Sequence, residues 1–351
     1  MKLYTLNTPC WSDYDPKNTA GSSLIQDPLS DHFTFMFYNF MKYGLVDEVT
    51  VFLEDKRIKR GIVQNSLSTD YGPITIKSAS DINVDQLEKN QYVYCWSKWE
   101  DCEKLKDNFV IVNPMFSGIS YPSVIKRSVH DYALIEGSAF EKTVPDWMDF
   151  DVFRYTTKDF CEISNKQRET SEKNYDWIMV SSFDPRKRHI EFLTELIKHS
   201  NVKKLRGCIV GRSPDNKGHY NTGHDVLSGI QKLKEDHSLD IDIFLNVSQE
   251  EKKKLILMSK VFVCSSSLDN GPRAMVEATQ AGLPLISMPH IGSSDLITKT
   301  TGVLVDKVSN FPDAVFQVLE NLKEYDRNYN AKILSPDVVY PRIIQKIRER
   351  K

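Results

Sequence analysis

The sequence predicts an α/β protein with two doubly wound parallel sheets, and three observations support this. The chain has 351 residues, a length that suits two domains. Short β-rich runs alternate with longer helical patterns throughout, which is typical of parallel sheets covered by helices. Several of the β-rich runs are continuously apolar, as expected for strands buried on both faces. We therefore expect two Rossmann-like domains facing a cleft.

The first half of the chain contains most of these runs, but its helices are weakly marked. FTFMFYNFMKY (Phe33–Tyr43) has only 11 residues, whereas a membrane span needs about 20, so we interpret it as a buried helix. The stretch Ile58–Ser80 is hard to assign as a whole. We expect strands at Lys2–Leu6, Glu48–Leu53, Ile74–Ile76, Tyr92–Cys95, Phe109–Val112, Ala133–Ile135 and Val152–Tyr155.

In the second half, the alternation of helices and strands is easier to assign. HIEFLTELIKH (His189–His199) has the apolar spacing of an amphipathic helix. We expect further helices at Asp225–Asp236, Gln249–Met258 and Arg273–Gln280. We expect strands at Trp177–Val180, Gly207–Val210, Ile241–Leu245, Val261–Cys264, Leu285–Met288 and Gly302–Val305.

A stretch without hydrophobic side chains separates the two halves. KQRETSEK (Lys166–Lys173) is either a linker or a solvated helix end, and we prefer a linker because a strong strand follows directly. The predicted organisation is an N-terminal domain over residues 1–168, a C-terminal domain over 169–325 and a helical segment over 326–351.

The composition excludes several classes of protein. The chain carries 46 Lys+Arg and 48 Asp+Glu, and a net charge of −2 argues against a nucleic-acid binder. The N-terminus has neither a signal peptide nor a transmembrane segment, although peripheral membrane contact stays open. The six cysteines form no C-x-x-C pair, which favours a reducing, cytoplasmic location.

The stretch Val261–Met288 carries the strongest chemical signal. A buried strand ends at Cys264, and after a polar loop Pro272 suits the first position of a helix. Free N–H groups at such a helix start, above the carboxyl ends of parallel strands, favour an anionic or hydroxyl-rich ligand. Two carboxylates, Asp269 and Glu277, bracket this turn, and Gly282 closes the helix.

This stretch resembles the signature of family 4 of the retaining glycosyltransferases, which have the GT-B fold. It reads SSSLDNGPRAMVEATQAGLPLIS and keeps the family's spacing of two carboxylates, with Asp269 in place of the usual first Glu. The resemblance implies that Asp269 and the following loop bind the donor sugar and that Glu277 binds the ribose. The loop residues are Asn270, Gly271, Pro272, Arg273 and Ala274.

Three further segments agree with the family in order. SSFDPRKRHIEFL resembles the family's G-R-x-x-x-x-K-G segment, whose cations bind the diphosphate, so Lys187 matches the Lys. Ser182 replaces the usual Arg, and Arg186 or Arg188 could compensate. CIVGRSPDN resembles the glycine turn beneath the nucleotide, and IDIFLNVSQEEKKKL the turn that contacts the base. These two matches add Gly211, Arg212, Asn246, Val247 and Ser248 to the donor site.

The resemblance places the acceptor on the N-terminal domain. The family's glycine-containing loop after the first strand loosely matches Thr19–Ser23, and therefore Gly21 and Ser22. Glu136 follows a strand at the position where the family often has a catalytic His. His130 precedes that strand, and a surface role suits it better. The family's last helix often returns to the first domain, as Tyr340–Lys351 could, with Ile343, Ile344 and Ile347 as its apolar side.

The resemblance implies a metal-independent, retaining hexosyltransferase with catalytic residues Asp269, Lys187 and Glu136. Its donor would be of the GDP-mannose or UDP-glucose type, its acceptor a glycan or other hydroxyl compound. We expect neither a cofactor nor a metal site. A GT-A enzyme would need a metal-binding D-x-D at the ligand edge, but Asp240 and Asp242 lie at the start of a strand. A GT-B sugar-nucleotide epimerase and a non-catalytic nucleotide-sugar-binding protein remain as alternatives.

Overall fold

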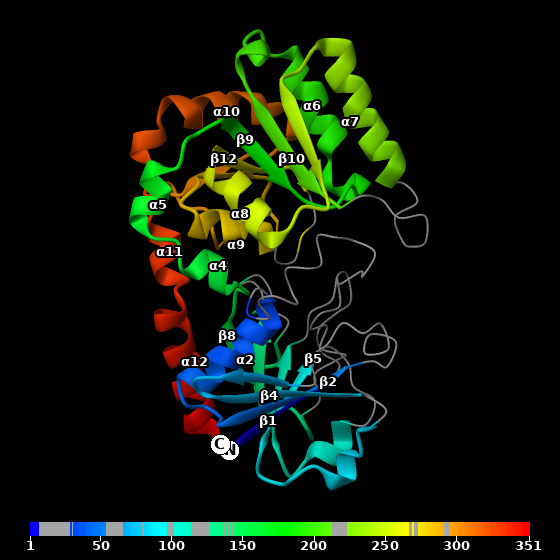
Figure 1. The fold of residues 1–351 in the computed structure, drawn as a ribbon, viewed down its shortest axis with the longest axis vertical. Coiled ribbons are helices and arrows are strands. Elements are labelled where there is room, and N and C mark those ends of the chain that lie inside the picture. Colours follow the sequence, from blue (N-terminus) through cyan, green and yellow to red (C-terminus); the bar gives the residue numbers. More distant parts are fainter. Residues whose placement is uncertain are drawn as a thin grey trace. The chain divides into compact units, whose positions relative to one another are not determined.

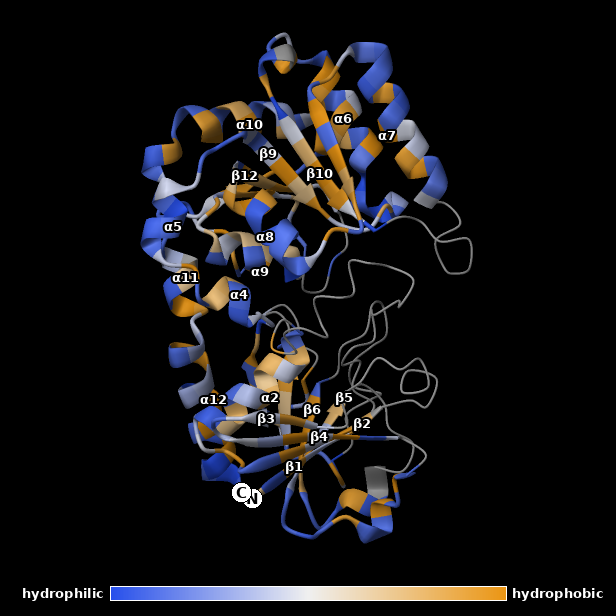
Figure 2. Cartoon of the chain, viewed as in Figure 1, coloured by the Kyte–Doolittle hydropathy of each residue, from blue (hydrophilic) through white to orange (hydrophobic). Residues whose placement is uncertain are grey.

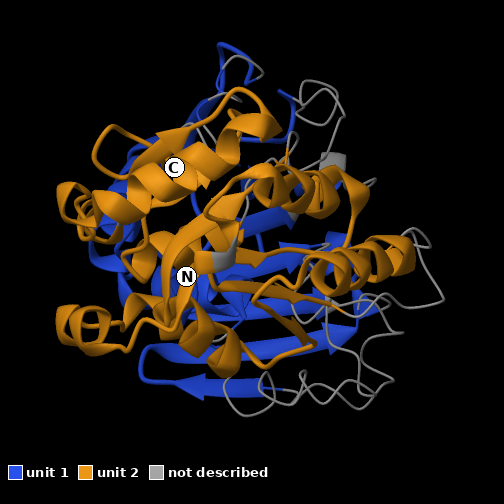
Figure 3. Cartoon of the chain, turned by 90° about the horizontal axis from the view of Figure 1, so that it is seen from above, with its two compact units in different colours: residues 1–158, 334–351 blue, residues 159–333 orange. Residues whose placement is uncertain are grey.

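The computed structural model describes residues 1–6, 29, 31–53, 66–78, 81–96, 102–113, 127–135, 138, 141, 144–212, 223–266, 269, 273–290, 292 and 295–351. The chain divides into two compact units, coloured separately in Figure 3. Unit 1 comprises residues 1–158 and 334–351, and unit 2 comprises residues 159–333. Each unit has its own sheet flanked by helices (Figure 1), so the two-domain α/β fold is confirmed.

Unit 1 contains an eight-stranded sheet in the order β3-β4-β2-β1-β5-β6-β7-β8. All neighbouring strands are parallel except β3, which forms a hairpin with β4. The strands are β1 (Lys2–Leu6), β2 (Glu48–Leu53), β3 (Ser66–Thr69), β4 (Gly72–Ser78), β5 (Tyr92–Trp96), β6 (Phe109–Asn113), β7 (Tyr132–Ile135) and β8 (Asp149–Val152). The described residues of this unit also include the 3-10 helices η4 (Val84–Gln86) and η5 (Cys102–Leu105).

Two helices far apart in the sequence pack together in the core of unit 1. Helix α2 (His32–Lys42) begins at Asp31, whose carboxylate accepts hydrogen bonds from two backbone N–H groups of the first turn. Helix α12 (Pro336–Arg350) lies against it, with the rings of Phe40 and Tyr340 5.8 Å apart. Ile343 and Ile347 of α12 are completely buried in the same core.

Unit 2 contains a six-stranded parallel sheet in the order β11-β10-β9-β12-β13-β14. Its strands are β9 (Tyr175–Val180), β10 (Gly207–Gly211), β11 (Ile241–Leu245), β12 (Ser259–Cys264), β13 (Leu285–Ser287) and β14 (Gly302–Leu304). Figure 2 shows the hydrophobic residues concentrated along β9 and β10. Strand order reverses between β9 and β12, and doubly wound sheets bind ligands at the carboxyl ends of the strands on either side of such a point.

The other α-helices in the described part of the chain lie between Lys158 and Ile333, and apart from Lys158, the first residue of α4, they belong to unit 2. They are α4 (Lys158–Cys161), α5 (Asn165–Thr170), α6 (His189–Lys198), α7 (Gly223–His237), α8 (Gln249–Leu257), α9 (Arg273–Gln280), α10 (Phe311–Glu320) and α11 (Tyr329–Ile333). Short 3-10 helices lie at η8 (Pro185–Lys187), η9 (Val202–Lys204), η10 (Val308–Asn310) and η11 (Leu322–Glu324).

Two structural expectations were wrong. The preferred linker over Lys166–Lys173 instead contains most of α5, which begins with a capping box between Ser164 and Gln167. The predicted boundary at residue 168 therefore lies inside unit 2, where Arg168 is buried. The strand predicted over Val152–Tyr155 runs over Asp149–Val152. Its last hydrogen bond to β7 is donated by the Phe153 N–H to the Ile135 carbonyl at 2.7 Å, and the side chains of Phe153 and Tyr155 pack into the core.

Candidate active site

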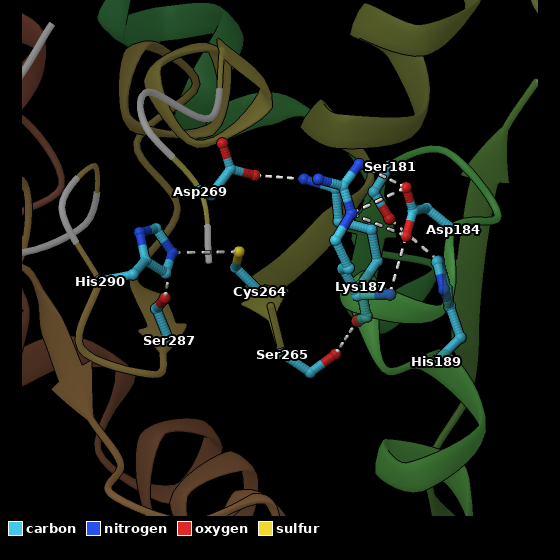
Figure 4. A network of polar contacts seen from close by, with 10 residues as sticks. Ser181, Asp184, Lys187, His189, Cys264, Ser265, Asp269, Ser287 and His290 are labelled. Carbon is cyan, nitrogen blue, oxygen red and sulfur yellow. Dashed lines mark hydrogen bonds and ion pairs between the residues drawn. The ribbon is translucent and has the colours of Figure 1, made fainter. Parts of the chain in front are cut away.

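The loops after β9 and β12 meet where the strand order of unit 2 reverses. Lys187, from the first loop, forms an ion pair with Asp269, from the second, and Figure 4 shows these two side chains. The two side chains are 21% and 17% exposed, so the pair is accessible without being fully solvated. The two residues predicted to bind the diphosphate and the donor sugar are thus adjacent.

A set of short-range contacts fixes the backbone around Lys187. The Asp184 carboxylate caps η8 by accepting a hydrogen bond from the Arg186 N–H at 2.8 Å. The next turn closes through Arg188, which has a left-handed backbone with φ of 53°. From the end of β12, the Ser265 hydroxyl donates to the Lys187 carbonyl at 2.6 Å. The lysine therefore projects from a turn that is tied to both central strands.

The two arginines beside Lys187 have different surroundings. The Arg186 guanidinium donates to the buried Asp184 carboxylate from Nε, at 3.1 Å to each oxygen, and from Nη2, at 2.6 Å. This contact lowers the pKa of the Asp184 carboxyl. Arg188 points to the loop after β13, with its Nη1 3.4 Å from the Met288 sulfur. Among the described residues, no carboxylate pairs with Arg188. Ser182 is half-buried in the turn after β9 and supplies no charge.

Sequence reasoning missed a buried histidine beneath the same turn. His189 is 1% exposed, and its Nε2 lies 2.9 Å from the Ser181 hydroxyl. Burial and the nearby Lys187 lower its pKa to about 4, so the imidazole is neutral at physiological pH. A second cluster joins His290 Nε2 to the Cys264 sulfur and the Ser287 hydroxyl at 3.6 and 3.3 Å (Figure 4). In the sequence, the only sign that these buried residues lie near the candidate site is that they follow the predicted strands closely.

Glu277 lies in α9 with its side chain buried. Its Oε1 accepts a hydrogen bond from Lys252 Nζ at 2.8 Å. Its Oε2 is buried and has no hydrogen-bond partner among the described residues. A buried carboxylate oxygen without a donor is costly, and a ligand hydroxyl could satisfy it. Lys252 is a second residue that sequence reasoning missed, because it lies within a run of three lysines.

The segments predicted to lie around the nucleotide occupy the ends of β10 and β11. A Cβ at Gly211 would lie 2.7 Å from both the Ser181 carbonyl oxygen and the Phe183 ring, so only glycine fits there. Asn246 has a left-handed backbone and donates its N–H to the Gly211 carbonyl at 3.0 Å. Ser248 caps α8, Val247 is half-buried and Arg212 is exposed.

The remaining predicted residues are distributed as follows. Arg273 is exposed and Ala274 half-buried at the start of α9, and Gly282 ends this helix with φ of 73°, as predicted. His130 is 4% exposed, so the surface role expected for it is wrong; it precedes a fully buried strand. The predictions for Gly21, Ser22, Glu136, Asn270, Gly271 and Pro272 lie outside the described residues.

Acidic residues at the other end of the sheet have structural partners. Asp242, in β11, accepts hydrogen bonds from the Tyr175 hydroxyl and Arg206, both at 2.9 Å. In the described part of the chain, no three His, Cys, Asp or Glu side chains gather as a metal site. Among the described residues, Cys95, Cys161, Cys208 and Cys264 are not in disulfide bonds. None of the described helices is long and apolar enough to cross a membrane.

Solved structures with this fold cover nearly the whole chain. HepE from Anabaena, solved with UDP and glucose, matches with a TM-score of 0.60 and 11% identity over 99% of this chain and 98% of that one. A trehalose-6-phosphate synthase, studied for glycosyl transfer with retention, gives 0.67 and 9% over 99% of both chains. Sucrose-phosphate synthase from Thermosynechococcus elongatus gives 0.63 and 10% over 99% and 97%. Curated protein sequences give no match.

The fold and these neighbours define the class of the protein: it has the GT-B fold of glycosyltransferases. The family model "Glycosyl transferases group 1" matches residues 162–333, nearly all of unit 2. The chain therefore carries a group 1 glycosyltransferase domain, and the Lys187–Asp269 pair and Glu277 all lie within it.

Proposed function

We propose that the protein is a metal-independent, retaining hexosyltransferase. It transfers a hexose from a nucleotide-diphosphate sugar, of the GDP-mannose or UDP-glucose type, to a glycan or other hydroxyl acceptor. The observation that supports this most is the Lys187–Asp269 pair at the reversal of strand order. It offers a cation for a diphosphate and a carboxylate for sugar hydroxyls within one short span, at the sheet edge where such folds bind ligands.

Each residue has a distinct role in this proposal. Lys187 and Arg188 neutralise the negative charge that develops on the departing diphosphate. Asp269 accepts hydrogen bonds from the donor sugar, and Glu277 accepts them from the ribose. The bond between the anomeric carbon and the diphosphate oxygen breaks, and the acceptor oxygen attacks from the same face. The acceptor proton passes to the leaving phosphate, so a protein base is not required.

Donor binding tests the proposal first. Incubation with UDP-, GDP- and ADP-sugars should raise the melting temperature for one nucleotide class by about 5 °C at a hundredfold excess over the dissociation constant, because such a ligand binds only the folded protein. Added EDTA should leave this shift and the transfer rate unchanged. A rate that falls with EDTA and recovers with Mn²⁺ would contradict metal independence.

Replacement of Glu277 tests the site. Glu277→Gln should lower the transfer rate by about 10- to 100-fold, because a charged hydrogen bond to the ribose is lost. Glu250→Gln is a matched control, since Glu250 is 73% exposed on α8 and pairs with Lys254 at the surface. Unchanged transfer by Glu277→Gln would refute the site. Turnover of the sugar nucleotide to an isomer without an acceptor would instead identify an epimerase, and donor binding without turnover a binding protein.

A further inference from the structure

Lys252 has no role in the function proposed above, yet its side chain is largely buried and contacts Glu277. Its Nζ donates to Glu277 Oε1 at 2.8 Å, and its side chain is only 16% exposed. The same ammonium lies 5.8 Å from the centre of the Phe160 ring. Its neighbour Lys254 is 66% exposed and pairs with Glu250 at the surface. The three lysines in a row are therefore not equivalent.

The contact makes the two carboxylate oxygens of Glu277 different from each other. Lys252 takes Oε1, while Oε2 is buried without a hydrogen-bond donor among the described residues. Glu277 as a whole is 6% exposed. Without Lys252, a buried carboxylate would lack compensation for its charge and would rotate away or draw in water. Lys252 thus holds the carboxylate in the one orientation that leaves Oε2 available.

Helix α8 links this contact to a second part of the predicted nucleotide site. The turn Asn246–Ser248 leads directly into α8, and the Lys252 N–H donates to the Ser248 carbonyl at 2.9 Å. The turn is itself tied to β10 through Asn246 and Gly211. One short helix therefore begins at the turn predicted to touch the base and, one turn later, supplies the cation on Glu277.

We infer that Lys252 is a positioning residue for nucleotide recognition: it orients Glu277 so that the free Oε2 accepts a hydrogen bond from a ribose hydroxyl. This inference rests on the proposed function. Lys252 itself does not touch the ligand. Its effect is therefore confined to nucleotides that carry ribose hydroxyls.

The test compares UDP, GDP and ADP with their 2′,3′-dideoxy analogues by calorimetry. Lys252→Met should weaken binding of the ribonucleotide by about 10- to 100-fold, because the carboxylate no longer presents Oε2, and should change binding of the dideoxy analogue less than about threefold. Lys252→Arg should restore most of the affinity. Lys254→Met, the exposed lysine on the same helix, should match the wild type.

The outcomes separate this inference from the function on which it rests. Binding of none of the three nucleotides to the wild-type protein would refute the proposed function and the inference with it. Equal losses for ribose and dideoxy nucleotides, or no loss at all, would overturn the inference alone. If Lys252→Met does not fold, the same comparison is made with Lys252→Gln, which also removes the positive charge but keeps a polar side chain. There, a ribose-specific change of at least about threefold supports the inference, and unchanged or equally changed binding of both nucleotides overturns it.

Discussion

The left-handed backbone at Arg188 is unfavourable for a residue with a side chain, by about 1–2 kcal/mol. Glycine would be free of this strain, and the family segment that this turn resembles has glycine there. Strained residues persist where the surrounding structure fixes them, and they are common at functional sites. The guanidinium of Arg188 extends towards Met288 on the neighbouring loop, whereas that of Arg186 is held by Asp184. Of the two arginines, Arg188 is the better substitute for the missing cation at Ser182.

Stability and activity should therefore respond in opposite directions at this residue. We expect Arg188→Gly to raise the free energy of unfolding by about 1 kcal/mol and to lower transfer at least tenfold, by about 1.4 kcal/mol in the transition state. Arg188→Ala should lower transfer equally but leave the strain in place. Arg186→Ala should leave transfer near the wild-type rate. Urea unfolding and initial rates check these values, and full activity of Arg188→Gly would exclude the guanidinium from the site.

His189 should make the protein sensitive to acid. Its pKa is about 4 in the folded chain against an ordinary value of 6.5, so the unfolded state takes up a proton first as the pH falls. The free energy of unfolding of the wild type should therefore fall by about 2 kcal/mol more than that of His189→Gln between pH 7.5 and 5. Denaturant titrations at both pH values measure this difference. Parallel pH profiles would mean that the imidazole has the same pKa in the folded chain as in the unfolded chain.

Helix α9 illustrates how local signals position an element. Its bounds, Arg273–Gln280, agree with the prediction because all the signals are local. These are the apolar spacing within the helix, the proline just before it and the glycine just after it. At its end, a Cβ on Gly282 would lie 2.8 Å from the Arg327 carbonyl oxygen, and φ is 73°. Both the backbone conformation and the close approach demand glycine.

Substitution at this helix end should be costly. Gly282→Ala is expected to lower the free energy of unfolding by at least about 2 kcal/mol, from the left-handed conformation and the overlap together. Gly44→Ala provides the comparison, because Gly44 has φ of 76° but only the flexible end of Arg348 nearby. That variant should lose about 1 kcal/mol. Equal losses, measured by chemical unfolding, would mean that the Arg327 carbonyl moves aside.

The sequence could not predict the contacts between elements. Asp269 and Lys187 are 82 positions apart, and their pairing depends on β9 and β12 being neighbours in the sheet. Lys252 has the same local pattern as Lys253 and Lys254, and only the packing of α8 near α9 distinguishes it. The candidate carboxylates Asp269 and Glu277, in contrast, could be selected from one short segment, by their spacing and by its resemblance to a glycosyltransferase signature. Local sequence patterns thus predict where helices and strands lie. Which side chains contact each other depends on which elements are neighbours in the fold, and local patterns do not contain that information.

At the scale of the whole molecule, α12 completes the core of unit 1. Its inward face buries Ile343 and Ile347, and Lys346 donates to the buried Asp151 at 3.0 Å. The helix is amphipathic, so its packing follows from the spacing of its isoleucines. Unit 1 is therefore built from two stretches of sequence with all of unit 2 between them.

A cavity at α12 should destabilise unit 1 alone. Ile347→Ala is expected to lower the free energy of unfolding of this unit by about 2–4 kcal/mol through lost burial and a residual void. The Glu349→Ala variant, two residues on and exposed, should change it by less than about 0.5 kcal/mol. Hydrogen exchange resolved by peptide assigns the loss to a unit. Faster exchange in the β9–β12 region of unit 2 would contradict independent units.

This division of unit 1 has a consequence for synthesis on the ribosome. Residues 159–333 emerge before residues 334–351, so unit 2 can reach its native structure while unit 1 still lacks a helix. Until α12 arrives, the apolar face of α2 that contains Phe40 remains uncovered. The apolar face of α2 that α12 covers therefore stays exposed on the nascent chain until all of unit 2 has been synthesised.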